Sequence, residues 1–239
     1  PEAALPVYLR INYAARRPIL RKVQHSDIPL LTGTPDRRNR DNNERDYYNG
    51  ALYFTPDGSM QMYYKMHLVP FAEYIPFSEK FPVLKRLNFG QGNFTPGRDF
   101  TLFEVESVPF GNLICYESSI PTFVSEFVRR GAKFLSIETN DSWCGHTSGV
   151  YQHFQIARLR AVENRIAIAR SANTGISGLI LPTGEVAKKI PYNEQQIILA
   201  EIPIRDLTSF YMRFGELFAI ICSLISIILL GIGWIKNRS

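Results

Sequence analysis

The sequence is poor in cysteine, in histidine and in concentrated basic charge, and each shortage excludes a class of protein. Three cysteines in 239 residues are too few for a disulfide framework. A net charge of +5, without a Lys/Arg block among aromatic residues, gives no sign of a nucleic-acid partner. His146 and His153 could join Cys144 around zinc, but a second cluster of ligands is missing, so we expect neither a metal nor a cofactor.

The sequence also has no initiator methionine and no signal peptide. It opens on Pro1-Glu2, a pair that we expect to follow a strand, so an α/β domain beginning here would lack its first strand and helix. We therefore expect the chain to be the C-terminal part of a longer protein. Residues 1–210 would form its catalytic domain, truncated at the N-terminus.

Short apolar runs alternate with amphipathic stretches along most of the chain, which predicts an α/β sandwich. Turn residues at Thr55-Pro-Asp-Gly58 and Pro182-Thr-Gly184 predict two hairpins, and the first delivers Lys65 at a strand end. The mixed-sign run from Asp36 to Asp46 predicts a solvated loop. The predicted helices cover 5–23, 121–130 and 150–164, and the predicted strands cover 28–33, 49–54, 60–64, 100–106, 111–114, 133–137, 166–170 and the 178–186 hairpin.

Residues 217–235 carry no charge and approach the length of about 20 residues that crosses a bilayer. Trp234 lies at the end of this run as an interfacial anchor, and Lys236 and Arg238 follow it. The positive-inside rule then predicts a cytoplasmic tail over 236–239 and a catalytic domain on the opposite side of the membrane. Arg205 and Arg213 on the other side weaken that charge argument.

Cys115 ends a short buried strand, at the edge of an α/β sheet where such folds place their chemistry. An isolated cysteine is more often a small buried hydrophobe. Glu2 and Lys65 change this interpretation because each ends another predicted strand, and together they offer a base and a cation to a thiol. A disulfide between Cys115 and Cys144 would consume this nucleophile, so we do not expect one.

Glu2, Lys65 and Cys115, in that order, resemble the catalytic triad of the nitrilase superfamily. The surrounding motifs resemble the apolipoprotein N-acyltransferase family more closely: Lys65-Met-His-Leu-Val-Pro-Phe-Ala-Glu-Tyr-Ile-Pro76, Ile114-Cys-Tyr-Glu-Ser118, Thr139-Asn-Asp-Ser-Trp143 and Gln152-His153. The resemblance implies a four-layer αββα sandwich followed by a transmembrane helix. It also implies that the missing part holds several membrane helices and the start of the catalytic domain.

The resemblance further implies an activity, a location and substrates. Cys115 would take an acyl chain from a membrane phospholipid as a thioester and pass it to the amine of a diacylglyceryl-cysteine lipoprotein. The enzyme would lie in the bacterial inner membrane with its catalytic domain on the periplasmic side. Cys144 and Val150 depart from the family's usual residues, an aromatic and a proline, at the rim of the site.

In this interpretation Glu2 is the base that takes the Cys115 proton, and its pKa should rise in a desolvated pocket. Lys65, with a backbone N–H near Cys115, would stabilise the oxyanion. Glu73 matches a second functional glutamate that orients Lys65 or assists proton transfer, with a local ion pair as the alternative. The positions of Tyr116 and Glu117 match family residues that shape the acyl pocket or support the loop. At Asn140, Asp141 and Trp143, a structural role in the turn is favoured.

Some alternatives stay open from the sequence alone. Residues 77–97 are either a loop packed on the domain or an amphipathic arm that enters the membrane interface beside the site, with Leu84 and Leu87 among its apolar residues. The competing functions are a membrane-anchored nitrilase-type amidase or carbamoylase, and an inactive membrane-tethered binding module.

Overall fold

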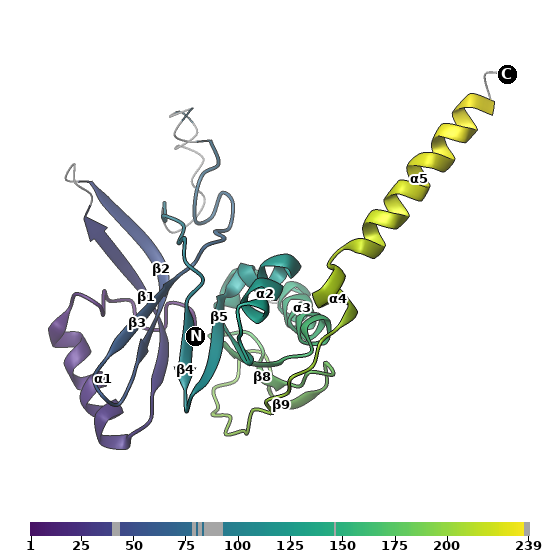
Figure 1. Cartoon of the computed structure of the whole chain (residues 1–239). Coiled ribbons are helices and arrows are strands. Elements are labelled where there is room, and N and C mark those ends of the chain that lie inside the picture. Colours follow the sequence, from purple (N-terminus) through teal and green to yellow (C-terminus); the bar gives the residue numbers. More distant parts are fainter. Residues whose placement is uncertain (40–43, 78–79, 81–82, 84–92, 146, 237–239) are drawn as a thin grey trace.

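Two β-sheets lie side by side between helices in the computed structural model (Figure 1), which describes residues 1–39, 44–77, 80, 83, 93–145 and 147–236. The first sheet is antiparallel and has the order β1 (Leu30–Asn39), β2 (Arg45–Phe54), β3 (Met60–Tyr64). In the second sheet the neighbouring strands β5, β6 and β7 are parallel and the flanking strands are antiparallel. Its strands, in spatial order, are β4 (Leu102–Val105), β5 (Val108–Ile114), β6 (Phe134–Thr139), β7 (Ala167–Ala172), β8 (Ser177–Ile180) and β9 (Val186–Ile190).

Helices cover the outer face of each sheet and complete four layers (Figure 1). The helix α1 (Tyr13–Ser26) lies against the first sheet, and α2 (Pro121–Arg129) and α3 (Gly149–Asn164) lie against the second. Two short 3-10 turns, η2 (Cys115–Ser119) and η3 (Asp141–Cys144), follow directly after β5 and β6. The α/β sandwich predicted from the alternation of elements is therefore confirmed.

The strand β2 joins the layers because successive side chains point to opposite faces. Tyr53 packs between the sheets, with its ring centroid 5.1 Å from that of Phe103 and 5.6 Å from that of Phe110. Leu52 and Phe54 point the other way, into a second buried cluster with residues of α1. The strand β2 thus contributes side chains to both hydrophobic cores.

Close packing behind the second sheet depends on a glycine. Gly111 in β5 faces α2, and a Cβ atom there would lie 2.6 Å from the ring of Phe127. Phe127 and Phe123 are both buried and meet edge to face, with ring centroids 5.4 Å apart. The helix that carries them begins at Pro121, which suits the first helical turn because it needs no N–H there.

Two predictions near the N-terminus are wrong. The helix expected over 5–23 begins only at Tyr13, because Leu5 donates its N–H to Gly33 in β1 and the preceding stretch runs along that strand. In the expected loop from Asp36 to Asp46, β1 continues to Asn39 and β2 starts at Arg45, while residues 40–43 lie outside the described part of the chain. Asp36 is buried there because the guanidinium of Arg10 pairs with it at 2.6 Å.

The described chain ends in α5 (Leu217–Lys236), a 20-residue helix in which an 18-residue window has a mean hydropathy of 2.6 and whose side chains are all outside the protein core. Figure 1 shows this helix projecting from the domain beyond the short helix α4 (Phe210–Phe214). Length and composition make it a candidate membrane span, as predicted. The arm considered for residues 77–97, with Leu84 and Leu87, lies mostly outside the described residues.

Candidate active site

Cys115 lies where β5 ends and η2 begins, with a backbone φ of +51°. Left-handed backbone is unfavourable for a residue with a side chain and persists where surrounding contacts enforce it. Such a sharp turn from strand to helix presents a side chain at the edge of the sheet. Cys115 contributes to the wall of a cavity of about 500 Å³ at this edge.

Glu2 and Lys65 line the same cavity and form a buried ion pair, with 3.1 Å between Lys65 Nζ and Glu2 Oε1. Lys65 follows directly after β3, as the hairpin predicted. Asn49 donates to Glu2 Oε1 at 2.7 Å, and the backbone N–H of Asn140 donates to Glu2 Oε2 at 2.9 Å. Because Asn49 belongs to β2 and Asn140 follows β6, the Glu2 carboxylate is fixed from both sheets.

Glu73 also reaches Lys65, with 2.9 Å between Nζ and the carboxylate. It accepts a second hydrogen bond from Asn49 at 2.9 Å and a third from the backbone N–H of Val69 at 2.8 Å. The predicted contact between Glu73 and Lys65 is therefore present. It is a buried pair inside the cavity.

The charges of the cluster act on one another. Burial alone would lower the pKa of Lys65, but the negative charges of Glu2 and Glu73 favour the ammonium form, and the pKa is raised. Burial, and then the charge of Glu2, raises the pKa of Cys115 from 9.0 to about 12, although Lys65 opposes this. A thiol in this environment rests in the neutral form, so attack on a substrate requires a base that removes its proton.

Glu117 is completely buried and joins η2 to the end of the first sheet. It accepts hydrogen bonds from the backbone N–H of Ile114 at 2.8 Å, from that of Met66 at 2.6 Å and from the Tyr63 hydroxyl at 2.8 Å. Burial raises the pKa of Glu117 from 4.5 to about 7, against the effect of these donors. These contacts tie the Cys115 turn to the segment after Lys65.

The cavity wall is mainly apolar apart from the charged cluster. Tyr116 lies on it and is partly exposed, and Trp143 lies on it with 60% of its surface exposed. Other apolar positions on the wall come from β1, from α3 and from loops: Ala3, Pro6, Pro35, Val69, Ala72, Phe94 and Ile156. Cys144 also lies there, and both it and Cys115 are free thiols. Such a wall suits an extended hydrocarbon group.

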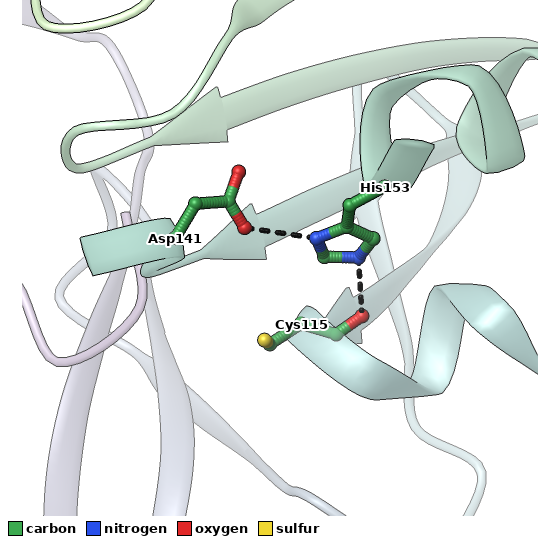
Figure 2. A group of neighbouring side chains, drawn as sticks. All are labelled: Cys115, Asp141 and His153. Atoms are coloured by element: carbon green, nitrogen blue, oxygen red, sulfur yellow. Dashed lines mark hydrogen bonds and ion pairs between the residues drawn. The ribbon is translucent and has the colours of Figure 1, made fainter. Parts of the chain in front are cut away.

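A further cluster beside Cys115 was not anticipated from the sequence (Figure 2). Asp141 was expected to satisfy backbone groups of its turn, which Asn140 does by accepting from Ser142 N. Asp141 instead pairs with His153 of α3 at 2.8 Å and with Arg170 of β7 at 2.8 Å. Gln152-His153 was among the motifs that resemble a known family, but nothing in the sequence paired His153 with Asp141.

Donor atoms of Cys115, Asp141 and His153 lie within 4.8 Å of one another, a spacing that a metal ion could use. The ring of His153, however, already makes hydrogen bonds from both nitrogens. In Figure 2 the sulfur of Cys115 points away from this ring, while its carbonyl oxygen faces the ring. The arrangement therefore favours a hydrogen-bonded network over a metal centre.

Known proteins resemble this chain along its whole length. An apolipoprotein N-acyltransferase from Chlorobaculum tepidum is 38% identical over 100% of the chain and 49% of the relative. Another from Geobacter metallireducens is 33% identical over 93% of the chain and 43% of the relative. The chain thus spans about half the length of these relatives.

Solved structures agree in fold at lower identity. Saccharomyces cerevisiae Nit3, a member of the nitrilase superfamily, has a TM-score of 0.56 at 18% identity and covers 76% of this chain and 62% of its own. A carbon-nitrogen hydrolase from Helicobacter pylori also has a TM-score of 0.56 at 18% identity, covering 77% and 65%. The fold is therefore nitrilase-like. Since the pattern of the carbon-nitrogen hydrolase family matches residues 1–211, the chain belongs to that family.

Proposed function

We propose that this chain carries the catalytic domain of an apolipoprotein N-acyltransferase, with Glu2, Lys65 and Cys115 as its catalytic residues. The observation that carries the proposal is the buried Glu2–Lys65 pair in the same cavity as the strained Cys115 turn. A base, a cation and a thiol together are what acyl transfer through a thioester requires. The relatives named as apolipoprotein N-acyltransferases support the choice of substrate.

In the first half-reaction Glu2 takes the proton of the Cys115 thiol as the sulfur attacks the ester carbonyl of a phospholipid. Lys65 stabilises the negative oxygen of the tetrahedral intermediate. The bond from the carbonyl carbon to the glycerol oxygen then breaks. Glu2 returns the proton to that oxygen, which releases a lysophospholipid and leaves the acyl chain on Cys115 as a thioester.

In the second half-reaction the α-amine of a diacylglyceryl-cysteine lipoprotein attacks the thioester. Glu2 takes a proton from the amine and returns it to the sulfur as the carbon–sulfur bond breaks, so that Cys115 is again a thiol. Glu73 orients Lys65 in both halves, Tyr116 shapes the acyl pocket and Glu117 supports the loop. No cofactor is needed, because the acyl group enters already activated as an ester.

Both substrates are lipids, which explains why the domain would be tied to a membrane. We assign residues 1–210 to the catalytic domain, 217–235 to a transmembrane helix and 236–239 to a cytoplasmic tail. This places the catalytic domain on the periplasmic side of a bacterial inner membrane. The apolar cavity wall and the exposed apolar surface of α5 support this assignment.

The test uses the intact protein in phospholipid vesicles and mass spectrometry of the peptide that contains Cys115. We expect a mass increase equal to one fatty acyl group, lost on addition of a diacylglyceryl-cysteine peptide. The adduct should be absent from Cys115→Ser and Glu2→Gln. It should persist in Glu185→Gln, which makes the same chemical change at an exposed carboxylate.

The alternatives give different results in the same experiment. A membrane-anchored amidase or carbamoylase would turn over small amides and show no stable phospholipid-derived adduct. An inactive binding module would show neither an adduct nor turnover. Either result in the wild-type protein would contradict acyl transfer.

A further inference from the structure

The ring of His153 touches the backbone of the candidate nucleophile, and the mechanism above does not use it. We infer that His153 is a positioning residue for Cys115: it holds the Cys115 carbonyl oxygen and thereby fixes the turn that aims the thiol. The inference rests on the proposed role of Cys115 as nucleophile. It assigns His153 a contact with the reacting residue and no proton transfer to substrate.

Figure 2 shows the ring between Asp141 and Cys115. His153 Nδ1 lies 2.8 Å from Asp141 Oδ1, and Nε2 lies 3.3 Å from the carbonyl oxygen of Cys115. Nε2 also lies 2.9 Å from the hydroxyl of Ser118, which donates to the same carbonyl oxygen at 2.7 Å. Two side chains, His153 and Ser118, therefore converge on the Cys115 carbonyl oxygen.

This carbonyl needs an external anchor because of the backbone at Cys115. A φ of +51° is unfavourable for a residue with a β-carbon, so the turn relaxes if nothing outside it opposes relaxation. Side chains that hydrogen-bond to this carbonyl oxygen oppose rotation of the peptide plane between Cys115 and Tyr116. That same peptide carries the N–H of Tyr116.

Asp141, the partner of His153 Nδ1, is itself held in place by two other side chains. Asp141 is buried and ionised, since its hydrogen bond with His153 and the charge of Arg170 lower its pKa although burial opposes them. Arg170 donates to Asp141 Oδ2 at 2.8 Å, and Thr139 donates to Asp141 Oδ1 at 2.9 Å. The Asp141 carboxylate and the Cys115 carbonyl oxygen can both only accept, so the ring holds the two together with an N–H on each nitrogen, and this pair of bonds fixes its orientation.

The chain of contacts therefore runs from β7 through Arg170, Asp141 and His153 to Cys115. Each link is a hydrogen bond between groups that are buried or partly buried. Charge-assisted bonds of this kind are stronger than neutral ones. The ring of His153 thus connects the strained Cys115 turn to β7, one of the parallel strands of the second sheet.

Two substitutions of His153 test its contact with Asp141 and its contact with Cys115 separately. Asparagine places its amide nitrogen near the position of Nδ1, so His153→Asn keeps a donor to Asp141 and loses the reach to Cys115. Glutamine places its amide near the position of Nε2, so His153→Gln keeps a group beside the Cys115 carbonyl oxygen and loses the pair with Asp141. A role confined to fold stability gives no reason for the shorter variant to react more slowly than the longer one.

Two rates are measured on the intact protein in phospholipid vesicles: acylation of Cys115, and alkylation of Cys115 by iodoacetamide. Cys144, a free thiol on the same cavity wall, serves as the internal reference for the reagent. We expect His153→Asn to slow both rates at Cys115 by about tenfold or more, and His153→Gln to stay within about threefold of wild type. Unchanged rates in His153→Asn, or equal losses in both variants, would overturn the inference.

Ser118→Ala provides an independent test of the inference if His153→Asn lowers the melting temperature. It removes the other contact to the Cys115 carbonyl oxygen, and we expect a loss of about threefold or more in both rates, with the largest loss in the double variant. Normal rates in Ser118→Ala together with an unstable His153→Asn would overturn the positioning role. Absence of acylation in the wild type would contradict the proposed function, while the alkylation rates would still decide the role of His153.

Discussion

Lys65 and Glu73 form a buried ion pair with 2.9 Å between the ammonium nitrogen and the carboxylate. Glu2 lies on the same ammonium at 3.1 Å, so one cation faces two carboxylates, and Asn49 donates to both of them. This arrangement leaves Lys65 with a charged partner when Glu2 takes up a proton. Glu2 can therefore alternate between its two forms without leaving a buried lysine unpaired, which would be costly.

Replacement of Lys65 tests the assigned oxyanion donor. We expect Lys65→Ala to slow formation of the Cys115 acyl-enzyme by about a hundredfold or more, since loss of one such donor typically costs this much. The measurement is single-turnover acylation in phospholipid vesicles, with Lys188→Ala as an exposed control. A near-normal rate in Lys65→Ala would remove Lys65 from the catalytic set.

Glu73 should matter less than Lys65 if it only orients the ammonium. We expect Glu73→Gln to slow acylation by about tenfold, because the amide keeps a hydrogen bond and loses one charge of the pair. Glu73→Ala should be slower still. A loss in Glu73→Gln as large as that in Glu2→Gln would instead place Glu73 in proton transfer.

The rate of Cys115 alkylation should keep rising to a higher pH than the rate at an ordinary cysteine. Its pKa of about 12 keeps the thiol neutral near pH 8, so the rate with iodoacetamide should still be rising above pH 9. Because the charge of Glu2 contributes to this shift, Glu2→Gln should lower the pKa and speed alkylation at pH 9, while it abolishes acyl transfer. Slower alkylation in Glu2→Gln would show that Glu2 does not hold the thiol in its neutral form.

Parts of the candidate site could be found from the sequence because each residue ends its own strand. Lys65 follows a hairpin with readable turn residues, and Cys115 follows a short apolar run. These two strands belong to different sheets, so local patterns placed each residue at a strand end, and the resemblance to a known family brought the two positions together. The contact between Glu2 and Lys65 could then be predicted from the order of the motifs along the chain.

The network around His153 could not be found in this way. Asp141 and Arg170 are 29 residues apart and meet across β6 and β7, and the ring joins them from a helix. Their pairing depends on strand register and on the placement of α3, which no local pattern specifies. The late start of α1 has the same origin, since the hydrogen bond from Leu5 to Gly33 is a contact between distant segments.

The helix α5 should hold the protein in a membrane. We expect Leu224→Arg to weaken insertion, because an arginine at the centre of a span costs about 3 kcal/mol. The measurement is the fraction of protein that stays with membranes after alkaline extraction, with Leu224→Ala as the control. Equal retention of Leu224→Arg and Leu224→Ala would mean that α5 is not a span in this protein.

Glu138 should make stability depend on pH. Its carboxyl group is buried between the sheets, against Gly33, and burial raises its pKa from 4.5 to about 8. Between these values the folded protein keeps a proton that the unfolded chain has lost, so the free energy of unfolding should fall as the pH rises from about 4.5 to about 8. One unit of pKa difference corresponds to about 1.4 kcal/mol.

Glu138→Gln removes this proton uptake and keeps the shape of the side chain. We expect the variant to be more stable than wild type at pH 8 by about 1 kcal/mol or more, and the difference to shrink at pH 5. Urea unfolding of the detergent-solubilised protein at both pH values measures it, with the exposed Glu185→Gln as the matched control. Glu117, whose pKa is also raised, is present in both proteins and cancels from the comparison. The same pH dependence in wild type and Glu138→Gln would mean that Glu138 is ionised in the folded state at neutral pH.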